Sequence, residues 1–313
     1  MVYAFDHVAG LYGRIGGRIA FVPVILSSLN ASYIPSRLVH YAERWLWPLV
    51  DKLVCNSEAG RRYLVQECRI PSERIAVIPN GFDVQSMACR RMALPSLREE
   101  LGLKYDRPLI GMIGRLERSK DPMAFARAAA IVHGQCPEAT FCIIGSGSAL
   151  PVVQEFLVQQ KMTDRFFLIP RRPDAPWLAR EFDIGVLSSR AEGLPNVVLE
   201  YMYWSKPCVV TDVGDCGLVV QHGRTGLVVP PRNPDALASA LLDLLDDPRK
   251  AKRMGELGRS RLEDHYRIER YVDDLERLLI SICGAHHLDL VDEEEEKEDK
   301  KASRLSSEGQ GHA

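Results

Sequence analysis

The sequence lacks a strong charge bias, a long apolar run and any regular arrangement of its cysteines. Its 313 residues include 40 lysines and arginines against 42 aspartates and glutamates, which gives a formal net charge of -2. A nucleic-acid-binding protein carries a basic surplus, so this balance argues against a nucleic-acid partner. The longest apolar stretch near the start, residues 19–26, is far shorter than the roughly 18 residues of a membrane helix, and Pro23 interrupts it. We therefore expect no transmembrane segment.

The beginning of the chain also lacks the successive basic, apolar and small-residue regions of a secretory signal peptide. The eight cysteines form no Cys-x-x-Cys pair, and no two histidines have metal-ligand spacing. This pattern favours neither a disulfide framework nor a zinc site, and most of the cysteines lie in apolar runs, as free buried thiols do. We expect no bound metal, and a reduced, cytoplasmic setting fits this cysteine usage best.

Length and composition predict a globular protein with about two domains, because 313 residues are 46% hydrophobic and 26% charged. Residues 1–88 supply only about four strands and no glycine-rich first turn, so we expect an incomplete Rossmann-like domain there. Residues 89–107 are predicted to be a linker with one short helix. Residues 108–265 alternate strands and helices with short loops, which indicates a complete parallel sheet covered by helices on both faces.

The end of the chain changes character twice. Between residues 248 and 282 the sequence predicts three amphipathic segments, with a break between residues 257 and 260, and the last segment has a helical apolar stripe. We assign residues 266–284 to a terminal helix. Residues 285–313 contain a run of acidic residues and lysines followed by Ser, Gly and Gln, and such a composition predicts a disordered charged tail.

The most informative stretch runs from Ala191 to Glu200 and reads Ala-Glu-Gly-Leu-Pro-Asn-Val-Val-Leu-Glu. It follows an apolar run, residues 183–187, that is typical of a buried strand, and Pro195 suits the first position of a helix. Open α/β sheets bind ligands at the carboxyl ends of their strands, and a helix start suits a phosphate. The carboxylates of Glu192 and Glu200 can accept hydrogen bonds from hydroxyl groups. A nucleotide sugar carries both phosphate and hydroxyl groups, so it fits the helix start and the two carboxylates together. Taken alone, an ordinary loop glutamate and a solvated helix glutamate explain the stretch equally well.

Two other strand ends in the second domain carry glycine. Gly114 and Arg115 end the first strand, with Lys120 shortly beyond, and a Gly145-Ser146-Gly147 loop ends the next strand. Glycine lets a ligand approach the backbone, and two cations at one sheet edge suit a diphosphate. Read singly, a basic surface loop and a strand-ending glycine explain these features as well. The second loop does not match G-x-G-x-x-G, and no acidic residue closes the following strand, so a dinucleotide cofactor is disfavoured.

Together these motifs resemble the retaining glycosyltransferases of family 4, which have the GT-B fold. The resemblance covers about residues 1–283 and rests on five matches: Gly114-Arg115-Leu116 with Lys120, the Gly145-Ser146-Gly147 loop, Glu192-Gly193-Leu194-Pro195-Asn196 with Glu200, Gly-Arg-Thr-Gly-Leu-Val-Val-Pro at 223–230, and Ile-Pro-Asn-Gly-Phe-Asp at 78–83. The resemblance implies two Rossmann-like domains that face a cleft. Residues 266–284 would form the helix that crosses back to the first domain.

The resemblance implies a role for each matching position. Arg115 and Lys120 would hold the donor diphosphate and neutralise charge on the leaving group without a metal. Glu200 would accept hydrogen bonds from the ribose, and Glu192 from the transferred sugar, so the implied catalytic residues are Arg115, Lys120 and Glu192. Residues 170–172 would lie beside the base. The further donor-binding positions are Gly114, Gly145, Gly147, Gly193, Leu194, Asn196 and Val197.

The implied reaction moves a hexose from a nucleotide-diphosphate sugar to a hydroxyl of a saccharide or lipid-linked acceptor, with retention at the anomeric carbon. Polysaccharide biosynthesis is the process that the family suggests, with no cofactor besides the donor substrate, and a peripheral membrane contact stays compatible with it. Asp6-His7 is similar to a histidine-bearing strand end that lines the acceptor site of relatives. The alternative for His7 is a surface role.

Other classes of function stay open. An incomplete first domain is compatible with a truncated fragment that binds nucleotide sugar without catalysis. A glycosidase would need two carboxylates flanking the bond at a set distance, and the cationic pair argues against that reading. An epimerase of the same fold would act on the nucleotide sugar without an acceptor, while a phosphorylase would need a lysine-bound cofactor that the sequence does not support.

Overall fold

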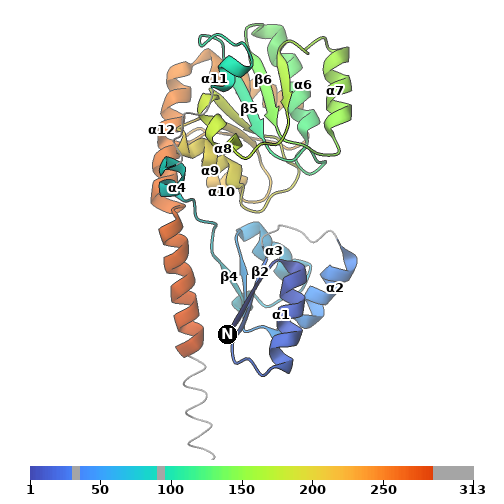
Figure 1. Ribbon diagram of the computed structural model, residues 1–313, viewed down its shortest axis with the longest axis vertical. Coiled ribbons are helices and arrows are strands. Elements are labelled where there is room, and N and C mark those ends of the chain that lie inside the picture. Colours follow the sequence, from blue (N-terminus) through green and yellow to red (C-terminus); the bar gives the residue numbers. More distant parts are fainter. Residues whose placement is uncertain (30–35, 90–95, 285–313) are drawn as a thin grey trace, which may run out of the picture.

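The computed structural model describes residues 1–29, 36–89 and 96–284. Its strands form a four-stranded sheet of order β1-β2-β3-β4 and a six-stranded sheet of order β10-β9-β8-β5-β6-β7. All registered strand pairs are parallel. Figure 1 shows each sheet in its own lobe, with a long helix beside both lobes at the end of the described chain. The predicted α/β class with two parallel sheets is confirmed.

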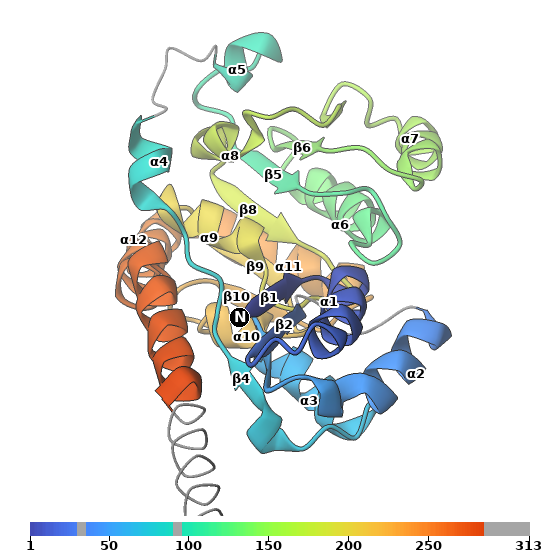
Figure 2. The same ribbon diagram turned by 60° about the horizontal axis from the view of Figure 1, so that its bottom comes forward.

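The first lobe is the four-stranded sheet with its helices. The strands are β1 (Val2–Phe5), β2 (Ile25–Leu29), β3 (Lys52–Cys55) and β4 (Ile75–Val77), and the helices between them are α1 (His7–Ile19), α2 (Arg37–Leu46) and α3 (Glu58–Gln66). These helices lie on the same side of the sheet (Figure 2). Because the strands are parallel, their carboxyl ends share one edge, and the starts of α1 and α3 both lie at that edge.

The second lobe is the six-stranded sheet with helices on both faces. Its strands are β5 (Leu109–Ile113), β6 (Thr140–Ile144), β7 (Phe166–Ile169), β8 (Ile184–Leu187), β9 (Cys208–Thr211) and β10 (Leu227–Val229). The helices are α6 (Pro122–Gln135), α7 (Leu150–Gln159), α8 (Ala175–Leu178), α9 (Asn196–Tyr203), α10 (Cys216–Val219), α11 (Pro234–Asp246) and α12 (Pro248–His265). The sequence predicted this alternation but missed the short α10.

Each face of the second sheet has its own apolar core. Ile110 and Met112 of β5 belong to the cluster that includes Phe125 of α6, while Leu109 belongs to the cluster on the other face with Tyr201 of α9. Neighbouring residues of a strand point to opposite faces of the sheet, so β5 contributes side chains to both clusters. Both faces are therefore buried, as the near-continuous apolar runs of these strands predicted.

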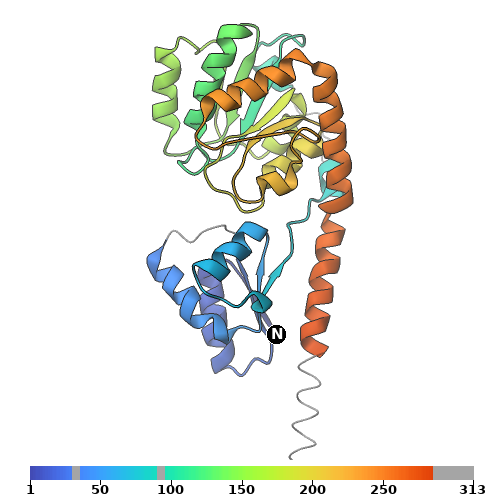
Figure 3. The same ribbon diagram turned by 180° about the vertical axis from the view of Figure 1, so that it is seen from behind.

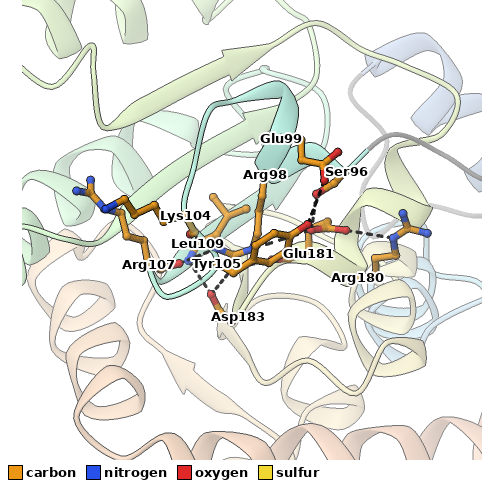
Figure 4. Close-up of polar contacts among 10 residues, drawn as sticks. All are labelled: Ser96, Arg98, Glu99, Lys104, Tyr105, Arg107, Leu109, Arg180, Glu181 and Asp183. Carbon is orange, nitrogen blue, oxygen red and sulfur yellow. Dashed lines mark hydrogen bonds and ion pairs between the residues drawn. The ribbon is translucent and has the colours of Figure 1, made fainter.

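The connecting segment between the sheets contains α4 (Val84–Cys89), which precedes the predicted linker of residues 89–107, and α5 (Leu97–Glu100), a short helix within the described part of that linker. Arg98 of α5 is only 5% exposed and fastens this segment to the second lobe. Its guanidinium donates to Asp183 Oδ2 at 2.7 Å, to the Arg107 carbonyl at 2.7 Å and to the Glu181 carbonyl at 3.2 Å (Figure 4). Buried arginine donors need such partners, and the network anchors the segment at the amino ends of β5 and β8.

Residues 268–284 form a helix that returns to the first lobe (Figure 3). Its apolar stripe packs on the face of the first sheet opposite α1, α2 and α3, against a cluster of Val24, Leu26, Val54 and Ile78. The side chains of the predicted apolar stripe that make this contact are Tyr271, Leu275, Leu278, Leu279 and Ile282. The last helix and the first sheet thus bury a shared apolar surface, so the end of the described chain packs on the lobe that its beginning forms.

Two local predictions, a helix break and a helix start, were wrong. The expected break after residue 257 is absent, because α12 is continuous through Gly255 and Gly258. Glycine there serves close packing, since a Cβ at Gly255 would lie 1.9 Å from the Ser205 carbonyl oxygen. Gly81 also lies in close packing, since a Cβ there would lie 2.5 Å from Ile268 Cα. Pro195 occupies the N-cap of α9 rather than its first helical position.

Among the residues that the structure describes, no helix is long and apolar enough to cross a membrane. The predicted disordered tail, residues 285–313, lies outside those ranges. Within the described ranges, seven cysteines are free thiols: Cys55, Cys68, Cys136, Cys142, Cys208, Cys216 and Cys283.

Candidate functional site

The strand order of the second sheet places its switch point between β5 and β8. From β5 the chain proceeds to β6 and β7 on one side, and then returns to β8, β9 and β10 on the other side. The loops that follow β5 and β8 therefore leave the sheet in opposite directions, and the crevice between them is where ligands of open α/β sheets bind. Residues 114–121 and 188–195, which carry most of the predicted site, form these two loops.

A pocket of about 380 Å³ opens at this switch point. It is lined by predicted donor-binding residues together with neighbouring loop residues, among them Gly114, Arg115, Gly145, Ser146, Arg171 and Glu200. Arg115 is exposed, and no atom lies within 4 Å of a Cβ placed on Gly114. The pocket therefore offers a cation and an accessible backbone on the loop after β5, and a carboxylate on α9.

The Gly145 loop packs directly on the loop that follows β5. A Cβ on Gly145 would lie 1.8 Å from the Gly114 carbonyl oxygen, and one on Gly147 would lie 2.4 Å from the Leu116 carbonyl oxygen. The Leu116 amide also donates to the Ser146 carbonyl at 3.0 Å. Only glycine fits where two backbones meet this closely. These glycines thus fix the floor of the pocket, and Gly147 supports it without lining it.

Lys120 and Glu192 form an ion pair across the two loops. Lys120 Nζ lies 2.5 Å from Glu192 Oε1, and Ser189 Oγ donates to the same oxygen at 2.5 Å. The Lys120 and Glu192 side chains are only 20% and 9% exposed. Sequence reasoning predicted that both residues serve the same ligand but not that they contact each other. In this arrangement each charge neutralises the other, and neither side chain lines the pocket.

A second ion pair, which the sequence did not indicate, holds the same two loops together. Arg190 donates to both carboxylate oxygens of Asp121, at 2.6 and 2.9 Å, and the pairing raises the pKa of Arg190. Asp121 is 4% exposed and adopts a left-handed backbone conformation, with φ 46° and ψ 53°. Ser188 Oγ donates to the Lys120 carbonyl at 3.1 Å. A non-glycine residue in this conformation is strained, and such strain concentrates at functional sites.

Glu200 is a half-buried residue whose carboxylate faces two pockets. It lines the pocket at the switch point and a neighbouring one of about 310 Å³ between the lobes, which Asn80 and Asn196 also line. Its Oε2 is buried and has no hydrogen-bond partner within the described part of the chain. Burial raises the pKa of Glu200 to about 7. An unsatisfied carboxylate of this kind is suited to accept hydrogen bonds from a ligand.

The start of α9 lies between these carboxylates. Pro195 is its N-cap, and the first N–H groups of a helix have no intrahelical partner, so Asn196 and Val197 can present theirs to an anion. Leu194 is only 7% exposed and packs in the apolar core, which leaves its backbone as the part near the ligand. Asn196 Oδ1 accepts from Asn80 Nδ2 at 3.0 Å, a contact between the lobes.

The two arginines of the predicted base-binding loop differ in their contacts. Arg172 is held by two carboxylates, because it donates to Asp174 at 2.7 and 2.8 Å and to Glu100 at 2.7 Å. These bonds raise its pKa and hold that of Asp174 below its ordinary range. The Arg171 amide donates to Ser146 Oγ at 3.2 Å, which ties this loop to the glycine loop.

His7, the predicted acceptor-side residue, lies in the first lobe and lines neither pocket. It is the first residue of α1, after Asp6, whose φ of 77° is again unusual for a residue other than glycine. His7 Nδ1 lies 3.6 Å from Glu43 Oε1, and the fully buried Glu43 pairs with the fully buried Arg14 at 2.6 Å. The structure therefore places His7 at the sheet edge that faces the second lobe, apart from the other predicted residues.

Across the described ranges, no group of three or more His, Cys, Asp or Glu side chains is arranged to hold a metal ion. The charged groups of the site include the cations Arg115, Lys120, Arg171 and Arg172 and the carboxylates Glu192 and Glu200. Such a set can bind a ligand that carries negative charge at one end and hydroxyl groups at the other.

Comparison with known proteins identifies two family matches that together span both lobes. The family described as Glycosyltransferase Family 4 matches residues 2–86, and the family described as Glycosyl transferases group 1 matches residues 107–247.

Curated relatives include a UDP-Gal:alpha-D-GlcNAc-diphosphoundecaprenol alpha-1,3-galactosyltransferase of Escherichia coli. It is 26% identical over 293 residues, which cover 90% of this chain and 75% of the relative. A D-inositol 3-phosphate glycosyltransferase of Paenarthrobacter aurescens is 32% identical over 225 residues. That match covers 68% of this chain and about half, 53%, of the relative.

Solved structures with similar folds include the Anabaena protein HepE in complex with UDP, with a TM-score of 0.78 and 21% identity over 89% of this chain and 78% of that one. The sucrose-phosphate synthase of Thermosynechococcus elongatus has a TM-score of 0.74 and 18% identity over 90% of this chain and 73% of that one. Two facing α/β lobes, a site at the switch point and matches along both lobes agree with one another. The chain belongs to the group 1 glycosyltransferases of family 4, with the GT-B fold.

Proposed function

We propose that the protein transfers a hexose from a nucleotide-diphosphate sugar to an acceptor hydroxyl, with retention and without a metal. The observation that carries this proposal is the switch-point pocket, where Arg115 and Glu200 face one cavity beside the Lys120–Glu192 ion pair. A nucleotide sugar has a diphosphate for the cations and hydroxyls for the carboxylates. The second lobe is then the donor-binding domain, and the first lobe binds the acceptor.

The donor would lie along the carboxyl edge of the second sheet. The diphosphate binds Arg115, Lys120 and the first N–H groups of α9, while Glu200 accepts hydrogen bonds from the ribose. Glu192, which Ser189 holds in place, accepts from a hydroxyl of the transferred sugar. Binding therefore separates Lys120 from Glu192, and each of them gains a partner on the donor.

The chemical step follows from this placement. The bond between the anomeric carbon and the diphosphate breaks, and negative charge develops on the departing oxygen, where Arg115 and Lys120 stabilise it. The acceptor oxygen attacks on the face that the diphosphate leaves, which retains the configuration. The departing phosphate oxygen is the base nearest to the acceptor proton. No protein carboxylate needs to bond to the sugar, so the two glutamates bind rather than react.

The comparisons support a uridine nucleotide and a membrane-linked or saccharide acceptor. The Escherichia coli relative is named for UDP-Gal and a diphosphoundecaprenol acceptor, and the Anabaena structure holds UDP. We therefore place a UDP-sugar first among the donors. His7, at the edge of the first sheet that faces the second lobe, is the acceptor-side residue of this proposal.

The test is a panel of UDP-sugars with undecaprenyl-diphosphate-linked and free saccharide acceptors, in which a glycosylated product is detected by mass spectrometry. A loss of transfer of about a hundredfold in Lys120→Ala, with a large loss in Glu192→Ala, supports the proposal, and the exposed Lys252→Ala is the matched control that keeps activity. UDP binding without transfer from any donor would instead favour the non-catalytic alternative. Activity that survives both substitutions would show that the site lies elsewhere.

A further inference from the structure

Asp215, in the loop that follows β9, reaches across to the first lobe. Its carboxylate accepts hydrogen bonds from the first two amides of α3, with the Glu58 nitrogen 2.7 Å from Oδ2 and the Ala59 nitrogen 2.8 Å from Oδ1. Asp215 is only 4% exposed. Ser57, the N-cap of α3, accepts from the next amide, that of Gly60, at 3.1 Å. The first three amides of α3 are thus satisfied, and the other lobe provides the partner for two of them.

This contact is electrostatically favourable in only one arrangement of the lobes. The start of a helix carries partial positive charge and free N–H groups, which suit a carboxylate. Burial raises the pKa of Asp215, and the amides of Ala59 and Glu58 oppose that rise. If the lobes separate, water must replace both charge-assisted bonds. The carboxylate therefore favours the closed arrangement of the two lobes.

The backbone of Gly214 and Asp215 supports the loop that carries Glu192. The Asp215 amide donates to the Gly193 carbonyl at 3.1 Å. Gly214 has a positive φ of 58°, and a Cβ there would lie 2.0 Å from the Glu192 carbonyl oxygen. Residues 214 and 215 thus contact Glu192 and Gly193 on one side and α3 on the other.

We propose that Asp215 is a positioning residue that couples closure of the lobes to the placement of the Glu192-Gly193 loop. It touches neither donor nor acceptor and acts through Glu192. The inference rests on the proposed function for the role of Glu192, while the coupling itself rests on the contacts with α3 and Gly193. When the first lobe docks on Asp215, the loop that holds the transferred sugar is fixed at the same moment.

Two substitutions remove the contact from opposite sides. Asp215→Asn keeps the shape of the side chain but replaces one accepting oxygen with an amide group that faces an N–H donor. Glu58→Pro removes the backbone donor instead, and proline suits this position because Glu58 is the first residue of α3. Ser57, which precedes it, already has the extended backbone that proline requires, with φ −152° and ψ 148°.

Each substitution has a matched control. Glu58→Ala loses the same side chain as Glu58→Pro but keeps the amide that Asp215 binds. Asp212→Asn changes an exposed carboxylate three positions earlier in the same loop. If the contact between Asp215 and α3 holds the lobes together, each test variant differs from its control in lobe separation and kinetics. A general effect of altering the loop or the helix would appear in the test variant and in its control alike.

The readouts are the separation of the lobes, by small-angle X-ray scattering in the presence of UDP, and the kinetics of sugar transfer. We expect Asp215→Asn and Glu58→Pro each to increase the radius of gyration and to lower kcat roughly tenfold or more, with the donor KM changed much less. The double variant should lose no more than either single one, because both remove the same interaction. Both controls should behave as the unchanged protein does.

Two results would overturn the inference. One is a pair of test variants whose lobe separation equals that of their controls, and this holds whether or not transfer is observed. The other is increased separation without a fall in kcat, which would show that closure does not place the loop. Absence of transfer by the unchanged protein with every donor would count against the proposed function, and the scattering comparison would still decide whether Asp215 holds the lobes together.

Discussion

Lys120 and Glu192 neutralise each other, with Nζ 2.5 Å from Oε1. They extend from the loops after β5 and β8, which are separated by 72 residues in sequence. A ligand that enters between them must supply an anion for one and hydroxyl donors for the other. This requirement selects ligands that carry both groups, and it favours a diphosphate-linked sugar over either free phosphate or free sugar.

We predict that Lys120→Ala lowers kcat about a hundredfold, since it removes a cation that stabilises the departing diphosphate. The donor KM should change less, because Arg115 and the start of α9 still bind the ground state. Steady-state kinetics with the best donor measures both constants, and Lys252→Ala is the exposed control. A rise in KM at unchanged kcat would mean that Lys120 contributes only ground-state binding.

Glu200 should make stability depend on pH in an unusual direction. Burial raises its pKa from 4.5 to about 7, so between these values the folded state keeps a proton that the unfolded state has released. The free energy of unfolding therefore falls as pH rises through this window, by up to roughly 3 kcal/mol. Glu200→Gln, which stays neutral, should lack this part of the decline and be more stable than the unchanged protein at pH 8.

Urea unfolding at pH 5 and pH 8 measures this effect, with Glu155→Gln, an exposed glutamate of α7, as the control. A Glu200→Gln variant with the same pH profile as the unchanged protein would contradict the assignment. UDP binding should show the opposite dependence and tighten as pH rises towards 8, since hydroxyl donors favour the ionised carboxylate.

We predict that Gly145→Ala disrupts the site, because the new methyl group would lie 1.8 Å from the Gly114 carbonyl oxygen. Backbone must move to relieve this contact, at a cost of about 1 to 3 kcal/mol in stability and with loss of UDP binding. Gly134→Ala in α6 is the matched control, with open space around it, and should stabilise the protein by about 1 kcal/mol. Thermal unfolding with and without UDP separates the two effects.

The Asp121–Arg190 ion pair should contribute more to the free energy of unfolding than an exposed ion pair does. Arg190→Ala leaves the 4% exposed carboxylate of Asp121 without its bidentate partner, and we expect a loss of about 3 kcal/mol in stability. Adding Asp121→Gly should restore part of that loss, because it removes the uncompensated charge and relieves the left-handed backbone. Equal stability of the single and double variants in denaturant unfolding would refute this account.

The features predicted correctly from sequence are local ones. The continuous apolar run of residues 183–187 predicted a buried strand, and β8 (Ile184–Leu187) lies there. The glycine loop at Gly145 was located, although its reason, a backbone contact with Gly114, needed the structure.

What the sequence did not reveal depends on contacts between distant segments. Asp121 meets Arg190 across 69 positions, and Asp215 meets Glu58 across 157. No spacing rule links residues so far apart, because the loops that join them vary freely in length. The catalytic roles of Arg115, Lys120 and Glu192, the donor-binding role of Glu200 and the acceptor-side role of His7 stay predictions.

The chain passes between the lobes twice, and the two passages lie side by side. Phe82 pairs with Arg267 in a parallel bridge, where the Phe82 amide donates to the Tyr266 carbonyl at 2.7 Å and the Ile268 amide donates to the Phe82 carbonyl at 3.1 Å. Rotation about the line of this bridge would swing the first lobe relative to the second, whereas sliding one passage along the other would break its hydrogen bonds. We therefore expect relative motion of the two lobes to follow a single hinge angle.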